Sequence, residues 1–320
     1  MRTIFLACVA CLTILHSPAA AGSGDARPDA DAARDVVAFG NRQGAVWLMR
    51  GDGSDKRRIA ADVEQYALSP DGGSLAFHDA NPKNANKVML LHAASGAVRD
   101  FIQAKSRVFD VIWAPDGSKI ACEINPPVPS PVLAKPISIF SPDGNAIGQI
   151  PGQGLWGVSF TGDGRALVAH NIRELFFFSL DGTVLSKTPL TAFTGQPENK
   201  FDSNDVFAPS PTAPDIFVCT KKVPGTKAFF KVTEEDNSAL YLHDKRQNPA
   251  KDVRLTPENI TAFDPVWSLD GKRIYFTGYP DSRVKAAFPF GIYRVNADGS
   301  GLSEIASGAL PKVGRETSRP

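Results

Sequence analysis

Three side chains of the sequence have the chemistry of a catalytic centre. Asp110 and Asp264 occupy the same place in two similar segments, FDVIW and FDPVW, and His170 follows the apolar run LVA. A pair of carboxylates can cleave a glycosidic bond, and an imidazole can transfer protons near neutral pH. With Asn204 or Asp205, the two aspartates can instead ring a channel and hold a metal or a cationic ligand. They can also simply bond exposed backbone, which we favour, and His170 is expected on a solvent-exposed rim.

Two predicted loops combine aromatic and cationic side chains, a composition that suits binding. Aromatic rings anchor a partner, and cations steer acidic groups towards the surface. The matching ligand is a protein, a peptide or an acidic glycan, although the same phenylalanines can instead pack each loop onto the fold. The eight residues are Lys227, Phe229, Phe230 and Lys231 in the first loop, and Arg283, Lys285, Phe288 and Phe290 in the second.

No pattern in the sequence predicts a metal or a cofactor. The four histidines after residue 21 have no metal-ligand spacing and no neighbouring cysteine. The segment GQGLWG at 152–157 has the glycine spacing of a dinucleotide site, but a predicted strand follows it where such a site needs a helix. Cys122 and Cys219 fall at equivalent places in separate repeats, too far apart for a disulfide, so we expect two buried free thiols.

A repeated turn positions these residues. Four segments contain an Asp-Gly turn and then a short apolar strand: SPDGGSLAF (69–77), APDGSKIAC (114–122), TGDGRALVA (161–169) and SLDGKRIYF (268–276), with a degenerate fifth copy at 210–219. In such a turn the aspartate bonds its own backbone, and the glycine takes the left-handed conformation. Because an apolar segment precedes each turn, each copy is predicted to be a β-hairpin.

A second kind of hairpin alternates with the first at a period of about 45 residues, the length of a propeller blade. Its good copies begin near residues 46, 88, 137, 174 and 291, and a sixth, with a longer turn, begins near 240. Two hairpins make a four-stranded sheet, which can hide its faces only against neighbouring sheets around an axis. The sequence therefore predicts an all-β fold, a six-bladed β-propeller of four-stranded antiparallel blades.

The repeat resembles that of a known family. The units SPDGGSLAF, WAPDGSKIAC and WSLDGKRIYF, paired with IYRVNADGSG, look like the WD40-like (PD40) repeat of TolB-like six-bladed propellers over nearly all of residues 36–306. TolB itself carries an α/β domain ahead of its propeller, where this chain has a short leader. The resemblance implies a binding or scaffold module of the cell envelope.

The chain divides into four predicted parts. Residues 1–21 combine a positive charge, an apolar run and small residues at a cleavage site, which predicts a secretory signal peptide and a periplasmic or secreted protein. Residues 22–35 are predicted to be a disordered leader, and residues 36–308 the propeller. Because the first blade lacks one strand, the C-terminal tail, residues 309–320, is the candidate for the strand that closes the ring.

Charge and hydropathy exclude several kinds of partner. The chain has 35 basic and 34 acidic residues, and the loss of Arg2 with the signal peptide makes the remainder neutral. We therefore expect no nucleic-acid partner. No segment after the signal is apolar enough to span a membrane, and we expect a monomer.

The long irregular segments of the sequence sort to one face of the predicted disc, which we call the variable loop face. They are residues 79–87, 125–136, 189–204, 220–238 and 279–290. Because loops longer than about 12 residues are often functional, we expect this face to bind an envelope protein, a peptide or a cell-wall polymer. The opposite face, which we call the turn face because it carries the Asp-Gly turns, is expected to be structural. The alternative function is a hydrolase or lyase that acts on a glycan or lactone at the central channel.

Overall fold

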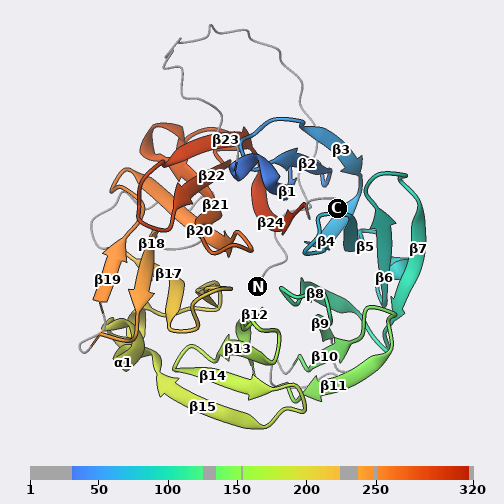
Figure 1. The fold of residues 1–320 in the computed structure, drawn as a ribbon, viewed down its shortest axis with the longest axis horizontal. Helices are drawn as coiled ribbons and strands as arrows, with labels where there is room; N and C mark the ends of the chain where they lie inside the picture. Colours follow the sequence, from blue (N-terminus) through green and yellow to red (C-terminus); the bar gives the residue numbers. More distant parts are fainter. Residues whose placement is uncertain (1–30, 125–134, 153, 224–236, 248–250, 317–320) are drawn as a thin grey trace, which may run out of the picture.

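The computed structural model is a ring of six β-sheets around a central axis (Figure 1). It describes residues 31–124, 135–152, 154–223, 237–247 and 251–316. Each sheet has four strands, and all pairings between neighbouring strands are antiparallel. The predicted fold class, an all-β six-bladed propeller, is confirmed.

In blades 2 to 6 the strands run in chain order from the axis to the rim (Figure 1). Blade 2 comprises β4 (Val63–Leu68), β5 (Ser74–Asp79), β6 (Lys87–His92) and β7 (Val98–Gln103). Blade 3 comprises β8 (Val108–Trp113), β9 (Ile120–Ile124), β10 (Ile137–Phe140) and β11 (Ala146–Ile150), and blade 4 comprises β12 (Trp156–Phe160), β13 (Ala166–His170), β14 (Glu174–Ser179) and β15 (Val184–Pro189). Blade 5 comprises β16 (Phe207–Pro209), β17 (Ile216–Lys222), β18 (Ser238–Asp244) and β19 (Lys251–Arg254), and blade 6 comprises β20 (Ile260–Trp267), β21 (Arg273–Pro280), β22 (Gly291–Asn296) and β23 (Ser303–Ser307).

The Asp-Gly turns join the two inner strands of four blades and follow the chemistry that their sequence predicts. In each, the aspartate Oδ1 accepts a hydrogen bond from the amide two residues further on; these aspartates are Asp71, Asp116, Asp163 and Asp270. The glycine that follows each aspartate has a φ between +66° and +73°, a left-handed conformation that glycine adopts without steric cost. The turn is therefore encoded locally and identically in four blades.

The core consists of apolar strands packed between neighbouring blades. Side chains on the second strands, such as Leu75, Ala121 and Val168, are completely buried. Contacts between blades are aromatic as well as aliphatic, since the ring of Phe101 on β7 stacks on Trp113 of β8 with 6.3 Å between centroids.

Cys122 and Cys219 are buried and free. Burial raises the pKa of each thiol. Both therefore stay protonated and serve as small core side chains.

Both ends of the described chain meet in blade 1, which contains β1 (Asp35–Gly40), β2 (Val46–Arg50), β3 (Arg57–Ala60) and β24 (Ala309–Arg315). β24 pairs antiparallel with β1 and lies nearest the axis, with Asp35 opposite Arg315 (Figure 1). The register shifts between Ala38 and Gly40, opposite Pro311. A bulge tolerates proline, which has no N–H to donate to the ladder.

The fold begins earlier than the sequence predicts. Residues 31–35, which we expected in the disordered leader, form the 3₁₀ helix η1 (Ala32–Arg34) and the first residue of β1. Ala32 and Asp35 are completely buried. This segment is ordered because its two aspartates bind arginines from the far end of the chain.

A group of charged residues holds the two chain ends together, and we call it the closure network: Asp31, Asp35, Asp270, Arg273 and Arg315. The buried Asp35 carboxylate accepts hydrogen bonds from Arg315 Nη1 at 2.7 Å, Arg273 Nε at 2.9 Å and Tyr275 Oη at 2.8 Å. These three donors lie on β24 and β21, so the carboxylate of β1 is satisfied only in the closed ring.

Arg315 is the most connected member of the closure network. Besides Asp35, its guanidinium lies 2.5 Å from Asp31 Oδ1 and 2.9 Å from Asp270 Oδ2. Lys272 Nζ binds Asp31 as well, at 3.0 Å. The hydrogen bonds from Lys272 and Arg315 hold the pKa of Asp31 well below its usual range, so this carboxylate stays charged under all mild conditions.

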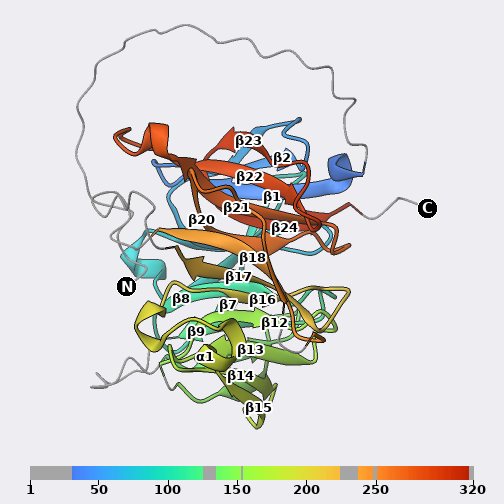
Figure 2. The same cartoon turned by 90° about the vertical axis from the view of Figure 1, so that its left-hand side faces the viewer.

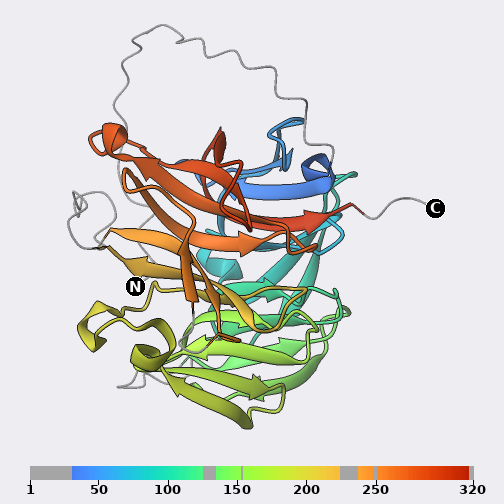
Figure 3. The ribbon, with the colours of Figure 1, turned by 60° about the vertical axis from the view of Figure 1, so that its left-hand side comes forward.

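The two faces of the disc differ in their short helices, as Figures 2 and 3 show. Helices η2 (Pro82–Asn84) and η4 (Asp281–Arg283) project from the variable loop face, whereas η1 lies at the turn face. Helices α1 (Leu190–Thr194) and η3 (Glu198–Lys200) belong to the connection between blades 4 and 5. None of the helices in the described part of the chain is long and apolar enough to cross a membrane.

A substitution at Gly51 can measure how tightly the ring closure is packed. A methyl group at this position would contact Tyr275 Oη and would lie 2.6 Å from the Ala32 carbonyl oxygen and 2.9 Å from Asp35 Cβ. We expect Gly51→Ala to lower the free energy of unfolding by about 1–3 kcal/mol, because overpacking displaces groups around a buried charge. Urea unfolding followed by circular dichroism measures this loss.

Gly73→Ala is the matched control, because its methyl group would meet nothing closer than 3.4 Å. We expect it to change the free energy of unfolding by less than about 0.5 kcal/mol. Equal losses in the two variants would contradict a tightly packed closure.

Candidate binding pocket on the turn face

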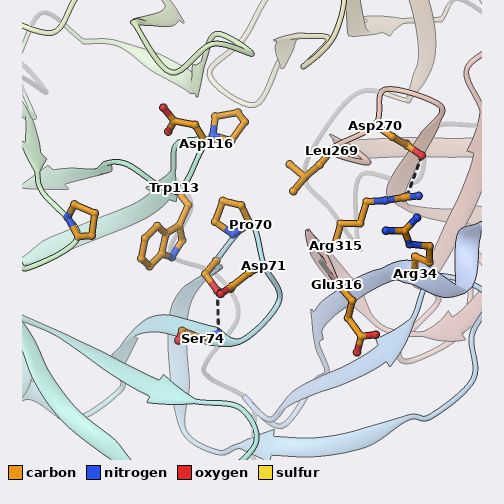
Figure 4. Close-up of a pocket in the computed structure, with 14 residues that line it drawn as sticks. Arg34, Pro70, Asp71, Ser74, Trp113, Asp116, Leu269, Asp270, Arg315 and Glu316 are labelled. Atoms are coloured by element: carbon orange, nitrogen blue, oxygen red, sulfur yellow. Dashed lines mark hydrogen bonds and ion pairs between the residues drawn. The ribbon is translucent and has the colours of Figure 1, made fainter. Parts of the chain in front are cut away.

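A pocket of about 740 Å³ opens on the turn face (Figure 4). Blade 2 contributes Pro70 and Asp71 to its lining, blade 3 contributes Trp113 and Asp116, and blade 6 contributes Leu269. The two chain ends complete the wall. The turns that the repeat encodes for folding therefore also surround a cavity.

One part of the pocket wall is apolar and rigid. It contains the indole of Trp113 and the side chains of Pro70, Pro115, Pro142 and Leu269. Trp113 is held in place by its stack on Phe101, and proline rings have no rotamer freedom to lose. Such a surface binds a ligand at a low cost in conformational entropy.

The indole Nε1 of Trp113 is shielded from solvent and has no hydrogen-bond partner in the part of the chain that the structure describes. Trp267 holds the equivalent position before the turn of blade 6, and its Nε1 donates to the Ala208 carbonyl oxygen at 3.1 Å. That bond ties blade 6 to blade 5. Because buried N–H groups are nearly always paired, the unused donor distinguishes Trp113 from Trp267 at the equivalent position.

Two carboxylates make another part of the lining acidic. Asp71 and Asp116 are exposed, and each uses Oδ1 to hold its own turn. The second oxygen of each has no partner among residues 31–124 or the other described ranges. Burial opposes the ionisation of Asp116, but hydrogen bonds from the hydroxyl and amide of Ser118 prevail and lower its pKa. This side of the pocket therefore attracts cations.

The chain ends make the remaining wall basic. Arg315 is bound by the closure network, and Glu316 pairs with Arg50 at 2.6 Å. Arg34 is exposed and lies beside Arg315 (Figure 4). Its guanidinium forms no ion pair or hydrogen bond with any residue that the structure describes. Counting only the described residues, the pocket thus carries an unpaired positive charge on one side and negative charges without ion-pair partners on the other.

The three channel candidates from the sequence lie on three different blades. Asp110 is on β8 of blade 3, Asp264 is on β20 of blade 6, and His170 ends β13 of blade 4. Asp110 is 6% exposed, and its Oδ1 accepts the amide of Val111 at 2.9 Å. Asp264 has a φ of +50°, a strained conformation at the bulge of β20. Within the described residues, no group of three or more His, Cys, Asp or Glu is placed to hold a metal ion.

His170 is completely buried, whereas the sequence places it on an exposed rim. Its Nε2 lies 2.9 Å from the carbonyl oxygen of Asp205, and its Nδ1 accepts the amide of Ile172 at 3.2 Å. The ring therefore donates from Nε2 and joins blade 4 to blade 5. Both ring nitrogens are therefore engaged in contacts with the backbone.

Asp205 is buried beside a lysine at the start of blade 5. Lys222 Nζ lies 3.5 Å from Asp205 Oδ1 and 2.8 Å from Asp202 Oδ2. Burial raises the pKa of Asp205 to about 6, although the charge of Lys222 works against this rise. Asp205 is therefore partly protonated in mildly acidic solution.

The predicted aromatic and cationic set is only partly described. Lys227, Phe229, Phe230 and Lys231 lie outside the described residues. In the second loop, Arg283 is bound to Glu304 by two bonds of 2.6 Å, and Lys285 is exposed. Phe290 is 3% exposed and packs against Phe288, at 5.2 Å between centroids, and against Phe263 and Tyr279. These contacts pack the second loop onto blade 6.

The turn-face pocket is the feature that the sequence did not predict. We expected that face to be structural, because its turns are short and uniform. A signal was available, since Trp113 and Trp267 both stand directly before a turn, where a large aromatic ring reaches the face of the disc. The basic wall gave no signal, because Arg34 and Arg315 are 281 positions apart in the sequence.

These features define the class of the protein as a six-bladed β-propeller with an apolar and charged pocket on its turn face. Its fold is similar to that of solved TolB propellers. It is similar to a putative TolB from Agrobacterium tumefaciens, with a TM-score of 0.55 and 12% identity over 88% of this chain and 98% of the other. It is also similar to TolB from Acinetobacter baumannii, with a TM-score of 0.60 and 14% identity over 88% of this chain and 67% of the other.

A third similar structure is the β-propeller domain of the Trilobed protease from Pyrococcus furiosus, with a TM-score of 0.50 and 13% identity over 85% of this chain and 81% of the other. No protein-family model and no curated protein matches the sequence. At these identities the likeness extends to the fold alone, so function must be argued from the site.

The raised pKa of Asp205 predicts that its ionisation destabilises the fold. A carboxyl whose pKa is about 6 when folded and near 4 when unfolded holds its proton more tightly in the folded state. Stability therefore falls as pH rises from about 4 to 6. We expect the difference in free energy of unfolding between Asp205→Asn and the natural chain to shift in favour of the variant by on the order of 2–3 kcal/mol as the pH rises across this window.

Urea unfolding at about pH 4, 5, 6 and 7 measures this gain. Asp298→Asn is the control, because Asp298 is fully exposed and its pKa is lowered, below the window. A difference between Asp205→Asn and the natural chain that stays constant with pH would contradict the raised pKa.

Proposed function

We propose that this protein is an exported binding propeller that takes an extended segment of a partner protein in its turn-face pocket. The observation that supports this most is the composition of the pocket wall. The rigid indole of Trp113 lies on the same side as the carboxylates of Asp71 and Asp116, and the guanidinium of Arg34, which has no ion-pair partner among the described residues, lies across the pocket (Figure 4). Concave sites with apolar walls and a few placed polar groups are typical of ligand sites.

Each part of the wall suits one part of a polypeptide. An apolar side chain fits against Trp113 and the prolines, and a backbone carbonyl can accept the unused Nε1–H. A basic side chain fits beside Asp71 and Asp116, and an acidic one beside Arg34. A neutral polysaccharide could stack on the indole but would leave these charges unmatched, so we favour a peptide.

The N-terminal sequence and the family resemblance support a place in the cell envelope. Residues 1–21 have the composition of a secretory signal peptide, and resemblance to TolB-like propellers implies an envelope module. The protein would then act as a monomer in the periplasm or outside the cell.

Two other functions, binding at the variable loop face and catalysis at the central channel, have less support. On the variable loop face, Phe290 is buried and Arg283 is bound to Glu304, so neither is free for a partner. A hydrolase or lyase at the channel needs a proton-transfer group, and both nitrogens of His170 are engaged. Asp110 and Asp264 lie on separate blades.

Selection from a random linear peptide library displayed on phage tests the binding function. We expect the immobilised protein to enrich peptides that combine an aromatic or aliphatic residue with charged ones. Trp113→Phe, which removes the N–H but keeps an aromatic ring, and Asp116→Asn, which keeps an acceptor for Ser118, should each weaken the enriched peptides about three- to tenfold. Isothermal calorimetry measures these affinities.

Asp163→Asn is the matched control, because Asp163 holds the same turn in blade 4 but does not line the pocket. It should leave peptide affinity unchanged. Failure to enrich any peptide, or equal effects of Asp116→Asn and Asp163→Asn, would argue against a peptide in this pocket. Retention on an acidic cell-wall polymer in place of peptides would favour the polymer.

Export predicts a defined cleavage. Removal of the signal peptide after Ala21 leaves Gly22 as the first residue. We expect intact-mass measurement of the protein from the periplasm of a Gram-negative host to show this form, and Ala21→Arg to leave an uncleaved precursor, because signal peptidase needs small residues there. A natural chain that stays at full length in the cytosol would refute export.

A further inference from the structure

The pocket and the ring closure share part of their structure. Arg315 lines the pocket and is a member of the closure network. The backbone secures the same wall, since the amide of Glu316 donates to the Arg34 carbonyl at 2.9 Å and the amide of Arg315 donates to the Pro70 carbonyl at 2.7 Å. The basic wall therefore exists only while β24 is docked on β1 and against the turn of blade 2.

The charges of the closure are balanced only when β24 is docked. Three carboxylates (Asp31, Asp35 and Asp270) meet three cations (Arg273, Arg315 and Lys272). Asp35 is completely buried, and the side chain of Arg273 is 4% exposed. Withdrawal of Arg315 would leave an excess of buried negative charge, which is strongly unfavourable. β24 thus tends to stay docked with all its contacts or to leave as a unit.

The closed state also gathers positive charge at the pocket. Among the described residues, Lys272 balances the third carboxylate of the closure network, and Arg50 is shared between Glu316 and Asp55, so Arg34 is the guanidinium beside Arg315 that none of these groups pairs (Figure 4). An anionic group placed on Arg34 would pair with this guanidinium, whose helix η1 is tied to the chain end by the bond from the Glu316 amide to the Arg34 carbonyl. The ligand chemistry that fits this wall is a carboxylate, as on an acidic residue of a peptide.

We propose that docking of β24 gates the turn-face pocket, and that a ligand carboxylate on Arg34 in turn stabilises the closed ring. This inference rests on the proposed function of the pocket. Opening removes the basic wall and separates it from the turn of blade 2, so the ligand binds only the closed state. By linkage, ligand binding then shifts the equilibrium towards closure.

Hydrogen–deuterium exchange of the full mature chain, read by mass spectrometry, tests the gate without a ligand. We expect Asp35→Asn to speed exchange in β24 and in residues 69–74 at least tenfold, while exchange in β13 and β14 stays unchanged. Asp31→Asn, which alters a partly exposed member of the network, should act in the same direction, and it carries the test if Asp35→Asn does not fold. Asp163→Asn is again the control.

A peptide enriched on the natural chain tests the second part of the proposal, that a bound ligand stabilises the closed ring. It should slow exchange in β24 of the natural chain and of Asp31→Asn at saturating peptide, because it binds only the closed ring. A bound peptide that leaves exchange in β24 unchanged would overturn the gate but not the proposed function. If no peptide is enriched, the proposed function fails, and unchanged exchange in residues 69–74 would overturn the gate independently.

Discussion

The buried carboxylate of Asp35 is the constraint on which the closed ring depends. It begins the first strand of the fold, yet all its side-chain donors come from the last 45 or so residues of the described chain: Arg273, Tyr275 and Arg315. A buried charge that loses one partner costs about 3–5 kcal/mol. Partial closure is therefore unfavourable, and the ring is either shut, with its inner strand in place, or open.

Closure also breaks the symmetry of the disc. Four blades carry the same Asp-Gly turn with the same hydrogen bonds, so the repeat alone would make the turn face uniform. The chain ends add Arg34, Arg315 and Glu316 on one side only. The acidic turns of blades 2 and 3 then face a basic wall, so the two sides of the pocket carry opposite charge. A function that needs an oriented ligand can arise only where the repeat is interrupted in this way.

The sequence predicts local features well and convergent ones poorly. Turns such as Asp116-Gly117 are encoded by neighbouring residues, and six of the resulting sheets can hide their faces only in a ring. The burial of His170 and Phe290 could not be predicted in this way, because each depends on a neighbouring blade or loop that the repeat does not specify. Nor could the closure network, in which Asp31 and Asp35 look like leader residues until Arg315 is placed beside them.

The two tryptophans that precede Asp-Gly turns show how function can be separated from fold within a repeat. In blade 6 the Nε1–H of Trp267 is bonded to blade 5, so this indole is explained by the fold. In blade 3 the ring of Trp113 packs on Phe101, but its N–H has no bond in the described structure. Packing alone would be served equally well by phenylalanine. A ligand acceptor at this N–H, as the proposed function requires, would account for tryptophan at 113, whereas Trp267 needs no such ligand because its N–H already bonds the neighbouring blade.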